Sequence, residues 1–599
     1  MKILSLYTNF PSSVAIIDDN KLIAAVNEER FTRVKNDESF PVHSIDYCLK
    51  EAGVSAKELD GVALASFISP FDDIVIKRST WKVSDYLKEQ ELRWKPYLIE
   101  KNVNEPKSLL EIFPEKIDLN QYPNEYLKKN YKDPKRNEKH WTNRIDLVAE
   151  YLGISKDKVK RIDHHKAHAY YSYYCSNLIG KKVLALTADG MGDGVNATIN
   201  TFDEDRVFER HFSTNKCAIA RIYRYMTLLL GMKPNEHEYK LMGLAPYGKE
   251  KYSQDSYNVF AETLKISGTE FVWNIEPTDS YYWFKEKLEG HRFDSIAWGL
   301  QTWVEKLLEE WTINCMKKFD IYNVIYSGGV AMNIKAMGKL AEIKQLKNLF
   351  IGGSASDESL CISSAICLRE DMLKDKRNFK RITNLYLGPS SSFNEEEQEI
   401  NKLDDKKYKI LSNINEKDKK EYIVENLTNG KIIGRCAGRM EFGQRALGNR
   451  SILADPRNIL IKEKINAAIK NRDFWMPFAP IILDKFSDDY IHNPKKLESP
   501  FMTIGFKLTE KGYENMIAAS HIADKTARPQ ILRKEDNPEL YEIIYKFYEK
   551  TGCGSLLNTS FNLHGYPIVS TPKDAIHVFE NSDLDILILN NFIIKKIKS

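Results

Sequence analysis

The sequence predicts an α/β fold in which the N-terminal part contains two similar strand-rich halves and the C-terminal part forms a second α/β domain. The chain opens with three short apolar runs, at residues 3–7, 14–17 and 22–26, separated by polar turns, and this pattern is typical of a β-meander. The pattern returns where an apolar run at 182–188 ends in the glycine-rich turn 189–194. Two such openings indicate a duplicated α/β architecture, although no sequence repeat is exact.

The length of the chain indicates at least two domains, because 599 residues exceed what a single hydrophobic core usually supports. The charged, mostly basic stretch 373–384 lacks apolar periodicity and is the best candidate linker. After it, helix-like stretches at 395–403 and 418–427 and the strand 431–436 predict an α/β domain of roughly 200 residues. The stretch 81–143, rich in Lys, Trp, Tyr and Asn, is expected to be an insertion in the first half.

The composition argues against several classes of protein. Hydrophobic residues make up 42% and charged residues 29%, as in globular rather than disordered chains. The 88 basic and 84 acidic residues nearly cancel, which speaks against a dedicated nucleic-acid or membrane surface. Eight cysteines without a C-x-x-C pair predict reduced, mostly buried thiols. Because the apolar start is too short for a signal peptide and no run of eighteen apolar residues occurs, we expect a cytoplasmic protein.

A histidine pair is a candidate metal site. His164 and His168 lie one helical turn apart, so on a helix both imidazoles face the same way and can share one divalent ion. A third ligand, preferably a carboxylate, is needed, and Asp189 or Asp357 could supply it if the fold brings either one to the pair. When only the spacing is considered, two such histidines are about as often ordinary surface or core residues as they are metal ligands.

Three glycine-rich turns follow predicted strands in the N-terminal part, at residues 189–194, 327–333 and 352–357. Turns of this kind let backbone amides approach a nucleotide closely, and the start of a following helix favours an anion. One such turn is more often only a turn. Three in one domain favour a nucleotide-binding site.

The C-terminal domain mixes cationic side chains with glycines and aromatics at residues 438–450 and 470–478. Guanidinium groups and flexible backbone suit a site that holds phosphates and stabilises developing negative charge. A solvated basic face is the commoner origin of a charge run, but it would gain nothing from three nearby glycines. The segments 526–530 and 557–562 add an arginine and a cluster of hydroxyl and amide side chains.

Taken together and in this order, these segments make the chain similar to the O-carbamoyltransferase family that includes the nodulation-factor and tobramycin carbamoyltransferases. The resemblance covers nearly the whole chain, and ten ordered matches are highly specific where each alone would be weak. The matching segments are residues 28–35, 164–169, 189–193, 239–248, 327–333, 354–359, 441–451, 474–480, 527–530 and 557–562.

The resemblance implies an actin/sugar-kinase-like carbamoyl-transfer domain over residues 1–375 and a YrdC-like domain over residues 385–599, whose last strands could return to the first domain. It implies an ATP-dependent O-carbamoyltransferase that works in two steps. The YrdC-like domain would form carbamoyl adenylate from the co-substrates ATP and carbamoyl phosphate. The first domain would then pass the carbamoyl group to an acceptor hydroxyl at a site that holds a divalent metal, with iron(II) expected first and manganese(II) or magnesium as alternatives.

The resemblance also implies roles for individual residues. The expected metal ligands are His164, His168 and Asp357. The residues expected to hold the nucleotide in the first domain are Asp189, Gly190, Lys240, Gly243, Gly328, Gly329 and Asn333, with Lys35 positioning the carbamoyl end. The residues expected to bind carbamoyl phosphate and ATP in the second domain are Arg445, Lys470, Arg528 and Ser560.

One position departs from the family pattern. Family members usually carry a His-Asp pair in the first strand turn, near the acceptor, where this chain has Phe10-Pro11. Neither side chain can accept a proton. We therefore expect the acceptor-activating base elsewhere, at Glu236 or His237 just before the segment 239–248.

Two other functions remain to be weighed. A threonylcarbamoyl-type transferase acting on tRNA would share the first domain, but the near-neutral charge and the attached YrdC-like part speak against it. A non-catalytic nucleotide-binding relative is disfavoured because the metal, arginine and lysine positions are intact. We expect a small-molecule hydroxyl acceptor such as a natural product or sugar, no nucleic-acid or membrane partner, and a quaternary structure for which a homodimer is one option.

Overall fold

The computed structural model describes residues 1–373, 377–412, 414–470 and 472–597. These residues form two compact units. Unit 1 consists of Met1–Glu29 and Asn36–Ile382, and unit 2 consists of Arg30–Lys35 and Thr383–Ser599. The candidate linker at 373–384 contains residues 374–376, which lie outside the described residues, as does Asn471 of the basic segment.

Unit 1 contains two five-stranded sheets with the same topology. In each sheet the first strand is central, an antiparallel pair of strands lies on one side of it, and two parallel strands lie on the other. The first sheet has the order β3-β2-β1-β4-β5: β1 (Lys2–Tyr7), β2 (Ser13–Asp18), β3 (Lys21–Asn27), β4 (Gly61–Ala65) and β5 (Val159–Ile162). The second has the order β8-β7-β6-β11-β12: β6 (Val183–Gly192), β7 (Val195–Phe202), β8 (Phe208–Thr214), β11 (Asn323–Ser327) and β12 (Asn348–Ile351). This repeated topology confirms the predicted duplicated α/β fold of the actin and sugar-kinase type.

The hairpin turns of the two sheets have the chemistry that a two-residue connection requires. Asp19 adopts a φ of 51° between β2 and β3, and Asp193 and Gly194 adopt φ values of 52° and 80° between β6 and β7. Asp, Asn and Gly tolerate this left-handed region, which matches the twist of the flanking strands. The glycine-rich turn after β6 therefore serves first as a hairpin turn.

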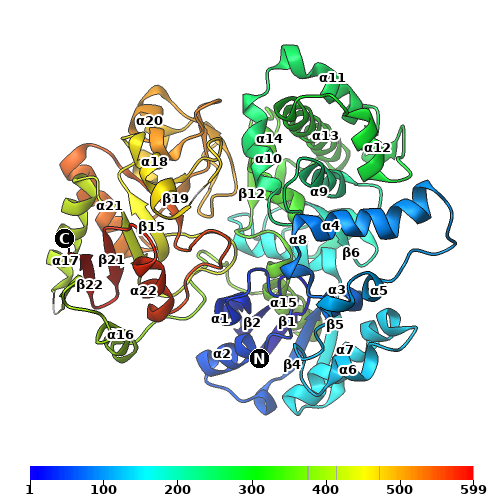
Figure 1. The fold of residues 1–599 in the computed structure, drawn as a ribbon, viewed down its shortest axis with the longest axis horizontal. Helices are drawn as coiled ribbons and strands as arrows, with labels where there is room; N and C mark the ends of the chain where they lie inside the picture. Colours follow the sequence, from blue (N-terminus) through cyan, green and yellow to red (C-terminus); the bar gives the residue numbers. More distant parts are fainter. Residues whose placement is uncertain (374–376, 413, 471, 598–599) are drawn as a thin grey trace. The chain divides into compact units, whose positions relative to one another are not determined.

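Two buried helices lie between the sheets of unit 1. Helix α8 (His164–Cys175) packs on β6 and β11, α15 (Leu360–Leu373) packs on β1, β2 and β4, and the two helices contact each other (Figure 1). Almost every side chain of α8 is buried, which is expected for a helix covered on all sides. The N-terminus of α8, which carries the histidine pair, and the start of α15, which follows Asp357, therefore lie close together.

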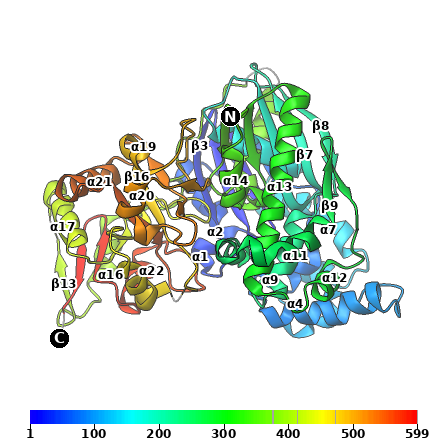
Figure 2. The same ribbon diagram turned by 90° about the horizontal axis from the view of Figure 1, so that it is seen from above.

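The other elements of unit 1 are mostly helical, and α11 runs along the long helix α13 (Figure 2). They are α2 (Val42–Ala52), α3 (Phe71–Val75), α9 (Ile219–Leu229), β9 (Leu264–Ser267), β10 (Glu270–Trp273), α10 (Glu238–Leu244), α11 (Glu250–Ala261), α12 (Ser280–Lys287), α13 (Phe293–Phe319) and α14 (Ile334–Ala341). The predicted insertion 81–143 contains α4 (Val83–Glu89), the π-helix η3 (Gln90–Ile99), α5 (Leu109–Ile112), α6 (Tyr126–Asn130) and the first part of α7 (Arg136–Leu152). Trp81, Tyr86 and Phe113 of the insertion pack in one small core with Leu228 of α9 and Tyr281 of α12.

Unit 2 is an α/β unit around one eight-stranded sheet of order β13-β22-β21-β14-β15-β20-β16-β19. The strands are β13 (Tyr408–Leu411), β14 (Ile433–Cys436), β15 (Arg450–Ala454), β16 (Ala479–Leu483), β19 (Gln530–Leu532), β20 (Ser555–Ser560), β21 (Ile586–Leu589) and β22 (Ile593–Lys596), with β17 (Phe506–Lys507) and β18 (Thr526–Ala527) paired apart. The helices are α16 (Phe393–Ile400), α17 (Glu416–Thr428), α18 (Leu460–Ile465), the π-helix η9 (Asn466–Lys470), α19 (Ser487–Tyr490), α20 (Glu510–Asn515), α21 (Pro538–Thr551) and α22 (Pro572–Glu580), and α1 (Glu29–Thr32) leads into the segment Arg30–Lys35. The last strands, β21 and β22, lie inside this sheet rather than in unit 1.

All eight cysteines are buried thiols that form no disulfide, as the sequence predicts. Among the described residues, no helix combines the length and the apolar character that a bilayer crossing needs.

A buried carboxyl group in unit 1 makes a pH-dependent stability prediction. Glu38 is buried and accepts hydrogen bonds from the backbone nitrogen and the hydroxyl of Ser79, at 3.0 and 3.2 Å. Burial raises the pKa of Glu38 from 4.5 to about 8 in spite of these bonds. The group is therefore neutral in the folded chain at pH 7 and ionised in the unfolded chain.

We expect Glu38→Gln to gain stability relative to the original chain as the pH rises. The folded-state pKa is raised, so the contribution of neutral Glu38 is complete below its unfolded pKa of 4.5 and is lost as the pH climbs toward 8. Glutamine does not titrate, so the difference in unfolding free energy should grow by roughly 3 kcal/mol between pH 5 and pH 8. Urea unfolding of both chains at pH 5 and pH 8 measures this difference in unfolding free energy. The surface variant Glu51→Gln is the control, and a difference for Glu38→Gln that does not change with pH would contradict the assignment.

Candidate functional site

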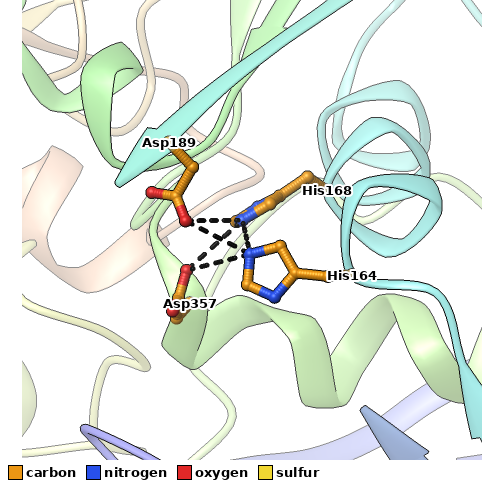
Figure 3. Close-up of side chains that lie close together, drawn as sticks. All are labelled: His164, His168, Asp189 and Asp357. Atoms are coloured by element: carbon orange, nitrogen blue, oxygen red, sulfur yellow. Dashed lines mark hydrogen bonds and ion pairs between the residues drawn. The ribbon is translucent and has the colours of Figure 1, made fainter. Parts of the chain in front are cut away.

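Four side chains from three elements of unit 1 converge on one point (Figure 3). His164 and His168 lie one turn apart at the start of α8, whose N-terminus is capped by Asp163 through a 2.7 Å bond from the backbone nitrogen of Lys166. Asp189 lies near the end of β6, and Asp357 opens the short helix η8 (Asp357–Ser359) just before α15. The sequence offered Asp189 or Asp357 as the third ligand, and the structure brings both carboxylates to the histidine pair.

The ligand-type atoms of this cluster lie close together. The Nε2 atoms of His164 and His168 are 3.0 Å apart. Asp189 Oδ2 lies 3.2 Å from the Nε2 atom of His164 and 3.9 Å from that of His168. Asp357 Oδ1 lies 3.5 and 3.3 Å from the same two nitrogens. All four atoms lie within 4.8 Å of one another, so one ion could contact them all.

The residues present fit a divalent cation. Ligand atoms about 2.1 Å from a shared ion lie roughly 3.0–3.5 Å from one another, which is close to the spacing found here. Asp357 Oδ1 is buried without a hydrogen-bond donor, although it faces two imidazoles. Two imidazole nitrogens with carboxylate oxygens suit iron(II), manganese(II) or zinc better than magnesium, which prefers oxygen ligands.

The electrostatic field of the cluster favours positive charge. Burial alone would lower the pKa of His164, but the carboxylates of Asp357 and Asp189 outweigh burial and raise this pKa to about 9. Burial would raise the pKa of Asp189, yet the hydrogen bond and charge of the imidazoles hold that pKa well below its ordinary value. Burial and the neighbouring imidazoles lower the pKa of His165 to about 3, so that histidine stays neutral. Its ring nitrogens pair with Thr187 and Val195, which makes it a structural residue.

Surrounding groups orient three of the four ligands, whereas Nδ1 of His168 is buried without a hydrogen-bond partner among the described residues. Ser66 Oγ lies 2.8 Å from Nδ1 of His164 and leaves Nε2 facing the cluster. Tyr7 donates its hydroxyl hydrogen to Asp357 Oδ2 at 2.6 Å, and the backbone nitrogen of Gly329 donates to Asp189 Oδ1 at 2.8 Å. Partners of this kind fix the orientation of metal ligands. Tyr7 and Ser66 carry no spacing signal relative to the ligands, so sequence reasoning missed them.

The glycines of the predicted nucleotide turns allow this close approach. A Cβ atom on Gly192 would lie 2.1 Å from the His164 ring, and one on Gly328 would lie 2.2 Å from the carbonyl oxygen of Ala188. Gly328 also has a φ of 94°. A Cβ on Gly329 would approach Asp189 Oδ1 to 2.8 Å. Gly328 and Gly329 therefore support Asp189, while their predicted contact with a nucleotide remains a prediction.

The other residues predicted to hold the nucleotide lie on nearby elements of unit 1. Gly190 follows Asp189 on β6, and Lys240 and Gly243 lie on α10. Asn333 caps α14 by accepting the backbone hydrogen of Ala336 at 3.0 Å, and its amide exchanges two hydrogen bonds with Gln301. Asn333 therefore has a structural role in addition to the predicted one.

The two predicted base candidates precede α10. Glu236 forms an ion pair with Lys233, whose ammonium group also donates to the backbone oxygen of Ser79 at 3.1 Å. Nδ1 of His237 accepts the backbone hydrogen of Lys233 at 3.1 Å. A neutral His237 therefore uses its acceptor nitrogen within the chain. Of the two residues, Glu236 is the better candidate for a proton acceptor.

A second cluster surrounds Lys470 in unit 2. Its ammonium group donates to the backbone oxygen and hydroxyl of Ser560, at 2.5 and 3.2 Å, and to the side-chain oxygen of Asn562 at 2.6 Å. Burial, followed by the positive charges of Arg472 and Lys35, lowers the pKa of Lys470 well below its ordinary value. The buried Lys470 therefore has two further cationic side chains, which are only partly buried, in its neighbourhood. An anion bound there would relieve their repulsion.

Contacts around residues 446–447 link the predicted arginines to this region. Asn558, on the same strand as Ser560, donates to the carbonyl oxygen of Ala446 at 2.8 Å, and Gln530 donates to that of Leu447 at 3.2 Å. Arg445 and Arg528 lie beside these contacts in the sequence. The structure thus gathers the segments that carry Arg445, Arg528 and Ser560.

Not every arginine of the basic segment can face a substrate. Arg450 is buried, and its guanidinium group donates to the backbone oxygens of Ala437, Gly438, Pro389 and Ser570. Gly438, Gly443 and Gly448 have φ values of 67°, 90° and 114°, which residues with a Cβ rarely adopt. Part of this segment therefore serves to shape the loop.

Lys35 belongs to unit 2, although it lies near the N-terminus of the chain. Arg30 donates to the backbone oxygen of Gly443 at 2.6 Å, and Arg33 donates to those of Ile568 and Pro567 at 2.8 and 3.0 Å. These bonds hold the segment Arg30–Lys35 on unit 2, where the charge of Lys35 acts on Lys470. The structure therefore groups Lys35 with the cationic cluster rather than with the glycine turns of unit 1.

Known proteins similar to this chain cover both units. The family model "Carbamoyltransferase N-terminus" matches residues 2–366, and "Carbamoyltransferase C-terminus" matches residues 424–596. An uncharacterized protein of Methanocaldococcus jannaschii is 31% identical, with 100% of both chains covered. The nodulation protein NolNO of Sinorhizobium fredii is 28% identical over 98% of this chain and 78% of its own length.

More distant similarities cover smaller parts. The 3'-hydroxymethylcephem-O-carbamoyltransferase of Amycolatopsis lactamdurans is 28% identical over 28% of this chain and 31% of its own length. A crystal structure of full-length HypF in the phosphate- and nucleotide-bound form is 12% identical and covers 63% of this chain and 47% of that chain. Its TM-score of 0.33 is too low to add to the fold assignment. The two matching family models, which together span most of both units, show that this chain is an enzyme of the carbamoyltransferase family.

Proposed function

We propose that the chain is an ATP-dependent O-carbamoyltransferase that prepares carbamoyl adenylate in unit 2 and delivers the carbamoyl group in unit 1. The observation that carries the proposal is the cluster around the buried Lys470, whose pKa is lowered by burial and by the positive charges of Arg472 and Lys35, because such a cluster suits a polyphosphate. The membership in the carbamoyltransferase family supplies the group that is transferred.

The first step balances with water as the third reactant. Carbamoyl phosphate and water give carbamate and phosphate, and the carbamate oxygen then attacks the α-phosphorus of ATP while pyrophosphate leaves. Lys470, Arg445 and Arg528 would neutralise the phosphate groups, and Ser560 would hold an oxygen by a hydrogen bond. Fixed cations in a dry site stabilise the charge that develops on a leaving group far better than water does.

The second step forms a bond between the acceptor oxygen and the carbamoyl carbon, while AMP leaves and the acceptor proton goes to a base. His164, His168, Asp189 and Asp357 would hold the divalent ion. When bound, such an ion supplies Lewis-acid polarisation of a carbonyl oxygen. Gly328 and Gly329 would bring backbone amides near the nucleotide, in the manner of other glycine turns.

We propose that the acceptor is a small molecule with a free hydroxyl, such as a natural product or a sugar, and that neither nucleic acid nor a membrane takes part. The near-zero net charge of +4 in 599 residues supports this choice. Release of phosphate and pyrophosphate from carbamoyl phosphate and ATP tests the first step. Mass spectrometry of hydroxylated metabolites incubated with the complete mixture tests the second, because the acceptor gains one carbamoyl group. A chain that releases no pyrophosphate under any condition would refute the proposal.

We expect Glu236→Gln to slow carbamoyl transfer while leaving pyrophosphate release unchanged. Removal of a general base typically costs about 10²- to 10⁴-fold, and the first step takes place in the other unit. His237→Asn should have a smaller effect, because Nδ1 of His237 already accepts a backbone hydrogen bond. Transfer to the acceptor found by mass spectrometry measures both variants. Full transfer activity in both would remove this pair from the mechanism.

A further inference from the structure

A chain of hydrogen bonds leads away from Asp357 into the interior of unit 1. Asp357 Oδ2 accepts the hydroxyl hydrogen of Tyr7 at 2.6 Å. Burial raises the pKa of Tyr7, and the neighbouring side chain of Asn9 opposes this rise, as a group that can donate to the Tyr7 oxygen does. The side-chain oxygen of Asn9 accepts the hydroxyl hydrogen of Ser69. Tyr7, Asn9 and Ser69 are all buried, so water does not compete for these bonds.

The chain continues into the insertion, which the sequence left without a role. Ser69 Oγ lies 3.2 Å from Nε2 of His140 on α7. Nδ1 of His140 lies 2.7 Å from the hydroxyl of Tyr126 on α6. His140 is only 1% exposed. Four hydrogen bonds and the interaction between Asn9 and Tyr7 therefore connect Tyr126, on α6 of the insertion, to a carboxylate of the metal cluster.

The chemistry of the groups gives every bond of this chain the same direction. Ser69 uses its single hydrogen on Asn9, so the bond to His140 requires a hydrogen on Nε2. Burial, followed by the nearby charge of Arg144, lowers the pKa of His140 well below its ordinary value, so the ring is neutral and its Nδ1 accepts from Tyr126. All donors thus point toward Asp357. Hydrogen bonds aligned in this way polarise and strengthen one another.

The same helix reaches a second ligand by an independent route. Arg144 lies one helical turn after His140 on α7 and donates to the backbone oxygen of Ser66 at 2.5 Å. Ser66 Oγ is the partner of Nδ1 of His164. Helix α7 therefore supports the loops behind two different ligands.

We propose that Ser69 and His140 are positioning residues that orient Asp357 through Asn9 and Tyr7, so that the insertion helix α7 determines how tightly the cluster binds a divalent cation. The proposal rests on the metal centre of the proposed function. Tyr7 occupies Oδ2 of Asp357 and turns Oδ1, which has no hydrogen-bond donor, toward the two imidazoles. The chain passes through Asn9, whose side chain cannot titrate and can still donate a hydrogen to the oxygen of Tyr7.

The test is a titration of the metal-free full chain with Co²⁺, in which the visible absorption of the bound Co²⁺ is monitored. Ser69→Ala and His140→Phe break the chain at two different bonds. We expect each to weaken Co²⁺ binding about 10-fold and to change the absorption spectrum, since loss of an outer partner of a metal ligand commonly costs 10- to 100-fold. His140→Gln keeps an N–H group that can reach Ser69 and should restore much of the affinity.

A matched control lies elsewhere in unit 1. Ser256 is buried and its hydroxyl lies 2.8 Å from Nδ1 of His291, which reproduces the Ser–His pair without a link to the cluster. Ser256→Ala should bind Co²⁺ as the original chain does. Thermal unfolding of each metal-free variant separates a folding defect from a change in affinity, and Ser69→Ala decides the question if His140→Phe does not fold.

The outcomes separate this inference from the proposed function. If the original chain binds Co²⁺ and Ser69→Ala and His140→Phe bind it with the same affinity and spectrum, the positioning role is wrong and the metal centre stands. If the original chain binds no Co²⁺ at all, the metal centre fails and this inference fails with it.

Discussion

Asp357→Asn is expected to lose the divalent cation and to reduce carbamoyl transfer by about 10³-fold or more, while pyrophosphate release continues. The substitution keeps an oxygen for the hydroxyl of Tyr7 but removes the negative charge that faces the Nε2 atoms of His164 and His168 at 3.5 and 3.3 Å. A Lewis acid lost from the transition state costs several kcal/mol, and each 1.36 kcal/mol is a factor of ten. Co²⁺ binding and the two reaction steps are measured separately.

Asp371→Asn provides a matched control for this variant. Asp371 lies on α15, the helix that follows Asp357, and pairs at the surface with Lys166 at 3.1 Å. It should retain both the metal and transfer. An Asp357→Asn chain that binds Co²⁺ as tightly as the original would show that this carboxylate is not a ligand.

Lys470→Met is expected to lower pyrophosphate release by about 10²- to 10³-fold, the usual cost of removing one preorganised charge from a site of this kind. Lys470 is buried and has the positive charges of Arg472 and Lys35 beside it, so its own charge is costly unless an anion balances it. Methionine keeps the volume of the side chain and removes the charge. Phosphate and pyrophosphate release from carbamoyl phosphate and ATP is the measurement.

This variant should also be more stable than the original chain in the absence of ligands, since it removes a buried cation. Lys464→Met is the control, because Lys464 is exposed and its ammonium group donates to the carbonyl oxygen of Gly430 at 3.2 Å. It should leave the first step unchanged. Normal pyrophosphate release by Lys470→Met would exclude Lys470 from the site.

Local patterns in the sequence predicted the parts of the site that lie within one element. The spacing of His164 and His168 predicts a shared helix face, and α8 provides it. The strand-turn-strand openings predict the first strands of each half and a duplicated architecture, because each hairpin is local and its turn residues are characteristic, and these strands open the two five-stranded sheets. Neither pattern could choose between Asp189 and Asp357. The structure includes both, because β6 and the start of α15 reach the same end of α8.

Residues that act through long-range contacts escaped prediction. Tyr7 and Asp357 are 350 positions apart, and no periodicity links them. His140 lies in an insertion whose composition carries no chemical motif, and its role depends on a contact with Ser69 across 71 positions. Such pairs become visible only when the fold is known.

Cationic segments were recognised as important, but their individual roles were not predictable. Arg450 stands in the most distinctive motif of the second domain and yet binds backbone oxygens. Lys35 was expected to serve the first domain by resemblance, and the structure places it in unit 2 because Arg30 and Arg33 bind carbonyl groups there. Charge patterns identify a segment, whereas the direction of each side chain depends on its tertiary partners.

The exchange of labelled pyrophosphate into ATP tests the central claim most directly, because it reports formation of the adenylate without any acceptor. The original chain and Asp357→Asn should both catalyse exchange that depends on carbamoyl phosphate, and Lys470→Met should catalyse almost none. Exchange that proceeds equally well without carbamoyl phosphate, or its absence in the original chain, would contradict the division of the reaction between the two clusters.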